Sequence, residues 1–151
     1  MTPLDPAPQS TDTDTEGRRS RLNALETVLD RPLAEVEGAI RQALSEEGFG
    51  ILTEIDVAAT LEAKLGVHRP PMKILGACKP SFAHRALEID PSLALLLPCN
   101  VVIEAADGGG THVSIADPRA LLAMGRDDDQ LAQLAAEAST ALAGALARLA
   151  R

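Results

Sequence analysis

Apolar residues recur along this chain with two alternating spacings, and this alternation limits the possible folds more than any other feature. Segments with every second residue apolar are typical of half-buried strands, whereas spacings of three and four residues are typical of helices. Residues 49–55 follow the first pattern, and residues 33–44 and 131–149 follow the second. A chain that switches repeatedly between the two patterns is expected to pack helices against a sheet.

Glycine, proline and aspartate residues separate these segments and set the order β-α-β-α-β-α-β-β-α. The predicted strands cover residues 22–29, 49–55, 72–78, 99–105 and 111–116. The predicted helices cover residues 33–47, 57–65, 81–89, 118–124 and 127–151, with a further turn at 93–97. This order predicts an α+β fold, a two-layer α/β sandwich. Its mixed or antiparallel sheet has about five strands, with helices packed on one face.

A two-layer arrangement leaves one sheet face or edge without a cover, and a homodimer is a common way to cover it. The chain length of 151 residues predicts a single domain. Residues 1–20 are rich in Pro, Thr, Ser and Asp and almost free of apolar side chains, which predicts a disordered acidic tail. The domain is therefore expected over residues 21–151.

Composition argues against several classes of partner. The chain has two Phe and no Tyr or Trp, so it lacks aromatic platforms for stacking bases. Its net charge of −8 is the opposite of the basic surface that nucleic acids and anionic membranes require. No apolar run reaches the roughly 20 residues of a membrane helix, and the first residues do not resemble a secretory signal. A cytoplasmic protein with two reduced cysteines is expected.

The segment around Cys78 is where the sequence places side chains capable of chemistry. Cys78 ends a predicted strand and lies just before a helix, whose N-terminus stabilises a thiolate. Lys79 adds a positive charge beside it, and His84 follows in the second turn of the helix. Cys99 and Asn100 begin the next predicted strand. We therefore expect a candidate ligand-binding site formed by Cys78, His84, Cys99 and Asn100.

Three interpretations of this site stay open at the level of sequence. The cysteines can be structural, because free cysteine packs as a small apolar residue. Cys78, His84 and Cys99 can instead bind a soft metal such as zinc or copper. The further donors available for a fourth position are His68, His112, Glu54 and Asp56. In the third interpretation, a redox protein uses Cys78 as the attacking thiol and Cys99 as the resolving one.

Strand direction decides whether the two thiols meet. If the strands that carry Cys78 and Cys99 are parallel, the thiols lie at opposite ends of the sheet. If the break at Asp90-Pro91 folds the connection back, the strands are antiparallel and the thiols lie at the same end. The sequence allows both arrangements.

Several motifs together resemble the domain-of-unknown-function 302 family. The matching stretches are Gly50–Asp56, Ile74–Pro80, Ala83–Leu87 and Leu96–Val101. They occur in the family's order across about residues 22–123. The resemblance implies a compact two-layer α/β sandwich from bacteria or archaea, often dimeric, with family residues at Cys78, His84, Cys99 and Asn100. It implies no reaction. We therefore expect a small-ligand or soft-metal binding module rather than an enzyme, with a purely structural or partner-binding domain as a further alternative.

Overall fold

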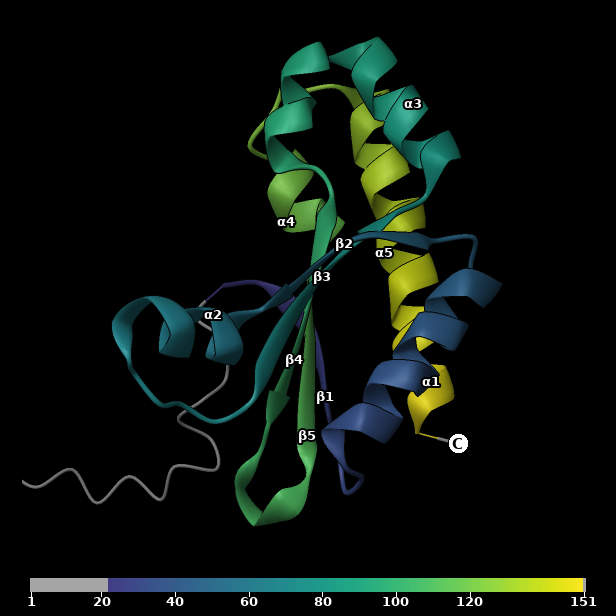
Figure 1. Ribbon diagram of the computed structural model, residues 1–151. Helices are drawn as coiled ribbons and strands as arrows, with labels where there is room; N and C mark the ends of the chain where they lie inside the picture. Colours follow the sequence, from purple (N-terminus) through teal and green to yellow (C-terminus); the bar gives the residue numbers. More distant parts are fainter. Residues whose placement is uncertain (1–21, 151) are drawn as a thin grey trace, which may run out of the picture.

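The sheet of this protein contains five strands, all of them antiparallel to their neighbours. The computed structural model describes residues 22–150, so the tail predicted over residues 1–20 lies outside the described residues. Along the sheet the strands follow the order β1-β5-β4-β3-β2 (Figure 1). Their bounds are β1 (Ala24–Leu29), β2 (Gly50–Asp56), β3 (Met72–Cys78), β4 (Cys99–Ala105) and β5 (Thr111–Ala116). Of the two predicted sheet types, the antiparallel one is found.

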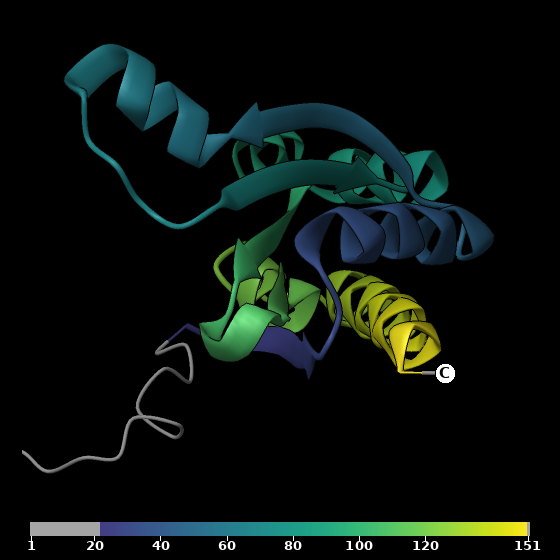
Figure 2. The same cartoon turned by 60° about the horizontal axis from the view of Figure 1, so that its bottom comes forward.

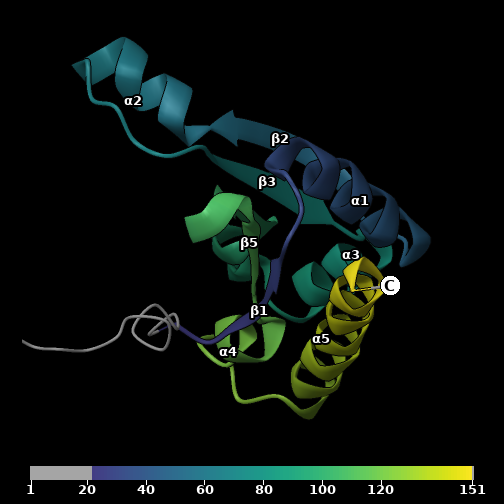
Figure 3. The same ribbon diagram turned by 90° about the horizontal axis from the view of Figure 1, so that it is seen from below.

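The helices occupy one side of this sheet and its ends. They are α1 (Leu33–Glu46), α2 (Val57–Leu65), α3 (Pro80–Ile89), α4 (Pro118–Leu122) and α5 (Asp129–Leu149), with 3-10 turns η1 (Pro91–Leu96) and η2 (Asp107–Gly109). Figure 3 shows α1, α3 and α5 together on one side, which confirms the predicted two-layer arrangement. Within residues 22–150, no helix is long and apolar enough to cross a membrane.

Aspartate side chains cap the first turns of α2, α4 and α5. The Asp56 carboxylate accepts a hydrogen bond from the Ala59 backbone N–H at 2.9 Å, and Asp128 accepts one from the Leu131 N–H at 3.0 Å. Each bond satisfies an N–H that has no partner inside its helix. Helix α2 ends at Gly66, whose φ of 66° lies in the left-handed region that glycine adopts without a steric cost. The sequence signals that predicted these boundaries therefore work as physical caps.

The core forms two clusters that meet at the phenylalanines. The larger cluster fills the space between the sheet and helices α1 and α5. The smaller one lies between α3, η1, α4 and the first half of α5. Phe82 packs against both clusters, and its ring meets Phe49 edge to face with centroids 6.2 Å apart. The two clusters are thus joined by the two aromatic side chains of the chain.

A bulge in β2 changes which side chains share a face. The continuous alternation predicted over residues 49–55 would place Ile51, Thr53 and Ile55 on the same side. The register instead shifts between Ile51 and Thr53, so that Ile51 pairs with Ala77 but Ile55 pairs with Ile74. An extra residue in one strand reverses the faces beyond it. The prediction is therefore wrong for Thr53 and Ile55, which lie on the face opposite to the helices.

Candidate functional site

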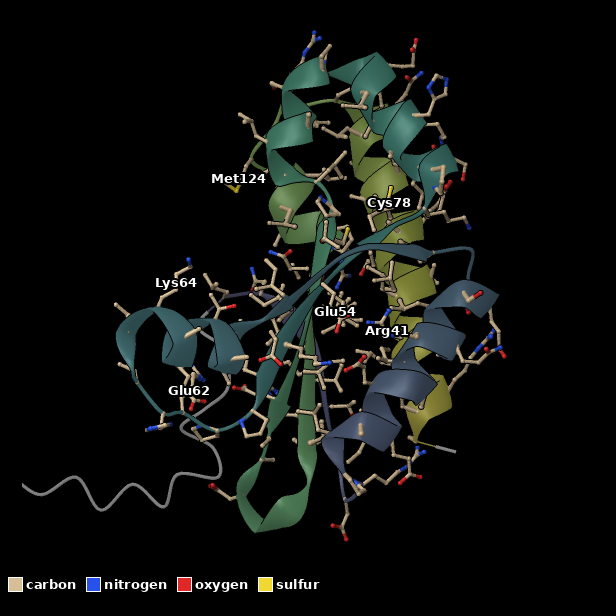
Figure 4. The ribbon with its side chains drawn as sticks, viewed as in Figure 1. Arg41, Glu54, Glu62, Lys64, Cys78 and Met124 are labelled. Atoms are coloured by element: carbon tan, nitrogen blue, oxygen red, sulfur yellow. The ribbon has the colours of Figure 1, made fainter. Side chains whose placement is uncertain are left out.

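The two cysteines of the chain lie at the same end of the sheet. Strands β3 and β4 are antiparallel, and Ala77 pairs directly with Cys99. Cys78 is the last residue of β3 and Cys99 is the first of β4, so the pairing places them on neighbouring strands. Figure 4 shows Cys78 at the end of its strand, where the chain enters α3. The turn η1 brings the chain back after α3, which is the antiparallel alternative left open by the sequence.

Burial controls the chemistry of Cys99. Desolvation, and then the negative charge of a Cys78 thiolate nearby, raise the pKa of Cys99 to about 11. A thiol with this pKa stays protonated at neutral pH, and the protonated form is a poor nucleophile. Neither cysteine is in a disulfide. Cys99 therefore contributes a neutral, weakly polar surface to its surroundings.

Both thiols border an apolar cavity of about 40 Å³ at the end of β3 and β4. The helix side of this cavity comes from Ala83 and Ala86 of α3 and from Leu134 of α5. Its remaining wall comes from η1, α4 and the core, through Phe49, Leu96, Leu97, Pro118, Leu121 and Leu122. A water molecule needs about 10 to 15 Å³ by this measure, so the cavity has room for roughly three water-sized groups. Its walls offer almost nothing for water to bind, which favours an aliphatic occupant.

Lys79 supplies the charge at this cavity. It is the only charged residue among those that line the cavity in the described part of the chain. Its ammonium group lies over the Phe82 ring, 4.5 Å from the ring centroid, an attractive cation–π contact. The Lys79 charge acts on the carboxylate of Glu137, which already accepts a 2.8 Å hydrogen bond from Arg85. This bond is the main reason that the pKa of Glu137 is lowered, and the Lys79 charge adds to it.

The other two residues of the predicted site point elsewhere. His84 is exposed on α3 and does not line the cavity. Asn100 is exposed and pairs with Gly76 on β3, one position along the strand from Cys99. Because successive side chains of a strand point to opposite faces, Asn100 faces away from the thiol of Cys99. Of the four predicted residues, Cys78 and Cys99 line the cavity, and His84 and Asn100 do not.

The three-ligand metal site is not assembled in the described residues. Within residues 22–150, no group of three or more His, Cys, Asp and Glu side chains is arranged to hold a metal ion. His68 is exposed in the loop after α2, and His112 lies on β5 between Glu104 and Glu26. Neither histidine lines the cavity beside the cysteines.

The carboxylates considered as further donors have structural roles. Glu54 accepts hydrogen bonds from Arg41 at 2.7 Å and Lys73 at 3.0 Å, and Figure 4 shows Arg41 and Glu54 close together. Lys73 also contacts Glu37 at 2.9 Å, so α1, β2 and β3 are joined by a network of charges. The Lys73 hydrogen bond is the main cause of a lowered Glu54 pKa. Asp56 caps α2, as described above.

The sequence indicates the two thiols of the site but not the walls of the cavity around them. Periodicity shows Phe82, Leu134 and Ala138 only as inward-facing helix residues. These residues share a cavity because α3 packs against the first half of α5. The sequence pattern shows which face of each helix is apolar but not which helices pack together. The sequence places the Lys79 charge beside Cys78, and the structure adds that Lys79 lines the cavity.

Comparison with protein families gives a direct match over most of the chain. The model of the family described as "Domain of unknown function DUF302" matches residues 25–149. The chain belongs to the DUF302 family. This confirms the family that the sequence motifs resemble.

A solved structure supports the same assignment. The DUF302 chain is similar to the crystal structure of an uncharacterized conserved DUF302 protein from Bacillus stearothermophilus, with 29% sequence identity and a TM-score of 0.76. The match covers 83% of this chain and 96% of the other. No protein with a curated description matches this chain. Family membership thus establishes the fold and assigns no activity.

Proposed function

We propose that this DUF302 domain binds a small ligand with a short aliphatic tail and an anionic head. The tail occupies the apolar cavity beside Cys78 and Cys99, and the head lies near Lys79. The observation that carries the proposal is an apolar cavity of about 40 Å³ with a single charged residue in its lining within the described chain. Apolar pockets with a few convergent polar groups are the usual form of small-molecule sites.

The size of the cavity sets the size of the tail. Room for roughly three water-sized groups corresponds to about three carbon atoms, far less than the ~150 Å³ that accommodates benzene. A tail of this length buries about 0.8 kcal/mol per CH₂ group. Butyrate is therefore a suitable probe, because its three-carbon tail and single carboxylate match the cavity and Lys79.

Two features favour an anion near Lys79. Its ammonium group contacts the Phe82 ring and makes no ion pair with a carboxylate in the described residues, and its charge acts on Glu137 only as a minor cause of a lowered pKa. Helix α3 begins at the next residue, and its N-terminus carries partial positive charge. Both features lower the energy of an anionic head placed at this point.

A methyl NMR titration tests the proposal. Butyrate is expected to bind with a Kd on the order of 1 mM and to shift the methyl signals of Leu134 and Leu97. The methyl signals of Leu95, which is exposed on η1, are expected to stay in place. Butan-1-ol has the same three-carbon tail as butyrate but ends in an uncharged CH₂OH group, so it is expected to bind more weakly. Absence of saturable shifts with both compounds would refute the proposal and favour a structural or partner-binding domain.

Charge removal tests the role of Lys79. In Lys79→Met the butyrate Kd is expected to rise about tenfold, since a charged hydrogen bond contributes about 1.5 kcal/mol or more. Binding of butan-1-ol is expected to be unchanged. Lys64→Met is the matched control, because Lys64 is exposed on α2 and does not line the cavity. Equal effects of both substitutions on butyrate binding would contradict the assignment of Lys79.

The neighbouring thiols favour one second candidate, a copper(I) site. Copper(I) prefers soft thiolate ligands, and Cys78 and Cys99 lie on paired strands. Because the pKa of Cys99 is raised to about 11, copper binding must release its proton and is expected to strengthen as pH rises. Competition with a copper(I) chelator tests this. Stoichiometric uptake that is lost in both Cys78→Ala and Cys99→Ala would support the candidate, and uptake that survives them would exclude it.

The same pKa argues against thiol exchange as the main role. The reactive form of cysteine is the thiolate, and a resolving Cys99 would be protonated at neutral pH. The redox alternative therefore has less support than ligand binding.

A further inference from the structure

Two cationic side chains contact the ring of Phe82, which lines the cavity beside Cys78. The Lys79 ammonium lies 4.5 Å from the ring centroid, and the guanidinium carbon of Arg85 lies 5.9 Å from the same centroid. Cations within about 6 Å of an aromatic centroid are attracted to the ring. Helix α3 carries Phe82 and Arg85, and Lys79 is its N-cap residue. One helix therefore places two positive charges around a side chain of the cavity wall.

Both cations also act on one carboxylate, that of Glu137 on α5. Arg85 donates a 2.8 Å hydrogen bond to this carboxylate, which is the main cause of its lowered pKa, and the Lys79 charge lowers the same pKa further. Helices α3 and α5 lie side by side, so the three charged groups come from adjacent elements (Figures 1 and 3). The protein thus already directs one anion toward both cations.

Arg85 keeps hydrogen-bonding capacity for a ligand. A guanidinium group carries five N–H donors, and among the described residues only Nη1 of Arg85 donates a hydrogen bond, to Glu137. The side chains of Arg85 and Glu137 are 46% and 40% exposed. An ion pair with this exposure contributes little to stability. A ligand therefore reaches Arg85 without disrupting the core of the protein.

The position of Lys79 is set by its neighbours. Gly48 has a φ of 84°, and a Cβ on it would lie 3.1 Å from Cε of Lys79. The lysine stem therefore lies against this glycine, while the ammonium group lies over Phe82. The adjacent carboxylate of Glu47 is already paired with Arg148 at 3.0 Å. A ligand that binds Lys79 has no ion pair of that lysine to break among the described residues.

We propose that the head of the ligand is a phosphate group held by Lys79 and Arg85, so that the ligand is a short alkyl phosphate. This inference rests on the aliphatic site proposed above and adds the identity of its head. A phosphate monoester carries a charge of about −1.5 to −2 at pH 7 and three acceptor oxygens. Arginine binds phosphate through two parallel hydrogen bonds, while lysine acts as a point charge. A carboxylate has one charge and two oxygens, so it gains less from the second cation.

Three anions with the same three-carbon tail test this head. Butyrate ends in a planar carboxylate, propane-1-sulfonate in a tetrahedral group with one charge, and propyl phosphate in a tetrahedral group with nearly two. Binding is followed by the methyl NMR titration of Leu134 and Leu97. Propyl phosphate is expected to bind about tenfold more tightly than either other anion, because a hydrogen bond between charged groups has an effect of this order.

Substitutions at Arg85 and Glu137 test which groups hold the phosphate. In Arg85→Met the Kd of propyl phosphate is expected to rise about tenfold, whereas the Kd of butyrate changes less than about twofold. Arg85→Lys keeps the charge but not the paired donors, so it is expected to recover only part of the loss. Glu137→Gln removes the competing carboxylate and is expected to tighten propyl phosphate binding several-fold, and more than butyrate binding.

Two control variants remove a positive charge elsewhere. Arg31→Met is the matched control, because Arg31 also pairs with a glutamate on a helix, Glu35, at 2.9 Å and does not line the cavity. Lys64→Met removes a charge from α2, which projects away from α3 and α5 (Figure 2). Both variants are expected to bind propyl phosphate as the wild type does. Circular dichroism confirms that each variant keeps the fold.

The outcomes separate this inference from the proposed function. If butyrate binds but propyl phosphate binds no more tightly than propane-1-sulfonate, the phosphate head is wrong and the aliphatic site stands. If none of the three anions binds, both proposals are wrong. Undiminished binding of propyl phosphate to Arg85→Met, or equal weakening of butyrate and propyl phosphate in this variant, would also overturn the role of Arg85.

Discussion

Ala77 on β3 pairs directly with Cys99 on β4, so that Cys78, the next residue of β3, lies at the same end of the sheet as Cys99, and both cysteines line one apolar cavity. The antiparallel direction of the two strands follows from the turn η1, which reverses the chain after α3. Had the strands been parallel, Cys78 and Cys99 would lie at opposite ends of the sheet. The site is therefore a consequence of topology as much as of residue type.

The first prediction concerns thiol reactivity. At pH 7.5 iodoacetamide is expected to modify Cys78 at least tenfold faster than Cys99, because burial raises the pKa of Cys99 to about 11 and leaves it protonated. Peptide mass spectrometry over time separates the two rates. As pH rises toward 11 the Cys99 rate is expected to increase sharply. Equal rates at pH 7.5 would show that Cys99 is not desolvated.

The second prediction links the same thiol to stability. A thiol whose pKa is about 11 when folded and ordinarily 9.0 favours the folded state below pH 9 and loses this contribution as pH rises toward 11. Between pH 9 and 11 the free energy of unfolding of the wild type is expected to fall by about 2 kcal/mol more than that of Cys99→Ala. Urea denaturation at both pH values measures the difference. Parallel losses in the two proteins would contradict it.

The fold was largely predictable from local signals. Asp56, Gly66 and Asp128 each fix a helix end through their own backbone or side-chain geometry, which depends only on nearby residues. The β2 bulge was not predictable, because it depends on how Thr53 packs over Gly76 from a different strand. For the same reason periodicity identified Phe82 and Leu134 as buried but not as neighbours around one cavity.

The third prediction compares two glycines, Gly76, which has no room for a methyl group, and Gly38, which has open space around it. A Cβ on Gly76 would lie 2.1 Å from Oγ1 of Thr53 and 2.7 Å from Cγ of Pro98. Gly76→Ala is therefore expected to lower the free energy of unfolding by about 1 to 3 kcal/mol. Gly38→Ala is the control: it lies inside α1 with nothing within 4 Å of the added Cβ, and it is expected to stabilise by about 0.5 to 1 kcal/mol.

Rescue distinguishes a clash from a general effect of alanine. Adding Thr53→Ala to Gly76→Ala removes the nearest obstructing atom and is expected to recover part of the lost stability. Urea denaturation of the four proteins measures this. Strictly additive losses would mean that Thr53 is not the source of the strain.

The fourth prediction concerns Asp117, which is buried before α4. It accepts hydrogen bonds from the Arg119 backbone N–H at 3.0 Å and from the Arg119 guanidinium at 2.8 Å, and the guanidinium bond is the main cause of its lowered pKa. Asp117→Ala is expected to lower the free energy of unfolding by about 1 to 2 kcal/mol at pH 7. A lowered carboxyl pKa gives stability above the ordinary value of 3.8 that is lost as pH falls below it.

Acid denaturation therefore separates the two proteins. The stability difference between wild type and Asp117→Ala is expected to shrink as pH falls below about 4. Thermal unfolding at several pH values follows this difference. A difference that stays constant down to pH 2 would mean that the charge of Asp117 contributes nothing to folding.

The most direct test of the proposed site is protection of Cys78 by a ligand. Iodoacetamide modification of Cys78 is followed with increasing butyrate, with acetate as the control because its tail is too short to fill the cavity. We predict saturable slowing by butyrate, with the same Kd as the methyl NMR titration, and little effect of acetate. An unchanged Cys78 rate at saturating butyrate would contradict ligand binding beside the thiols.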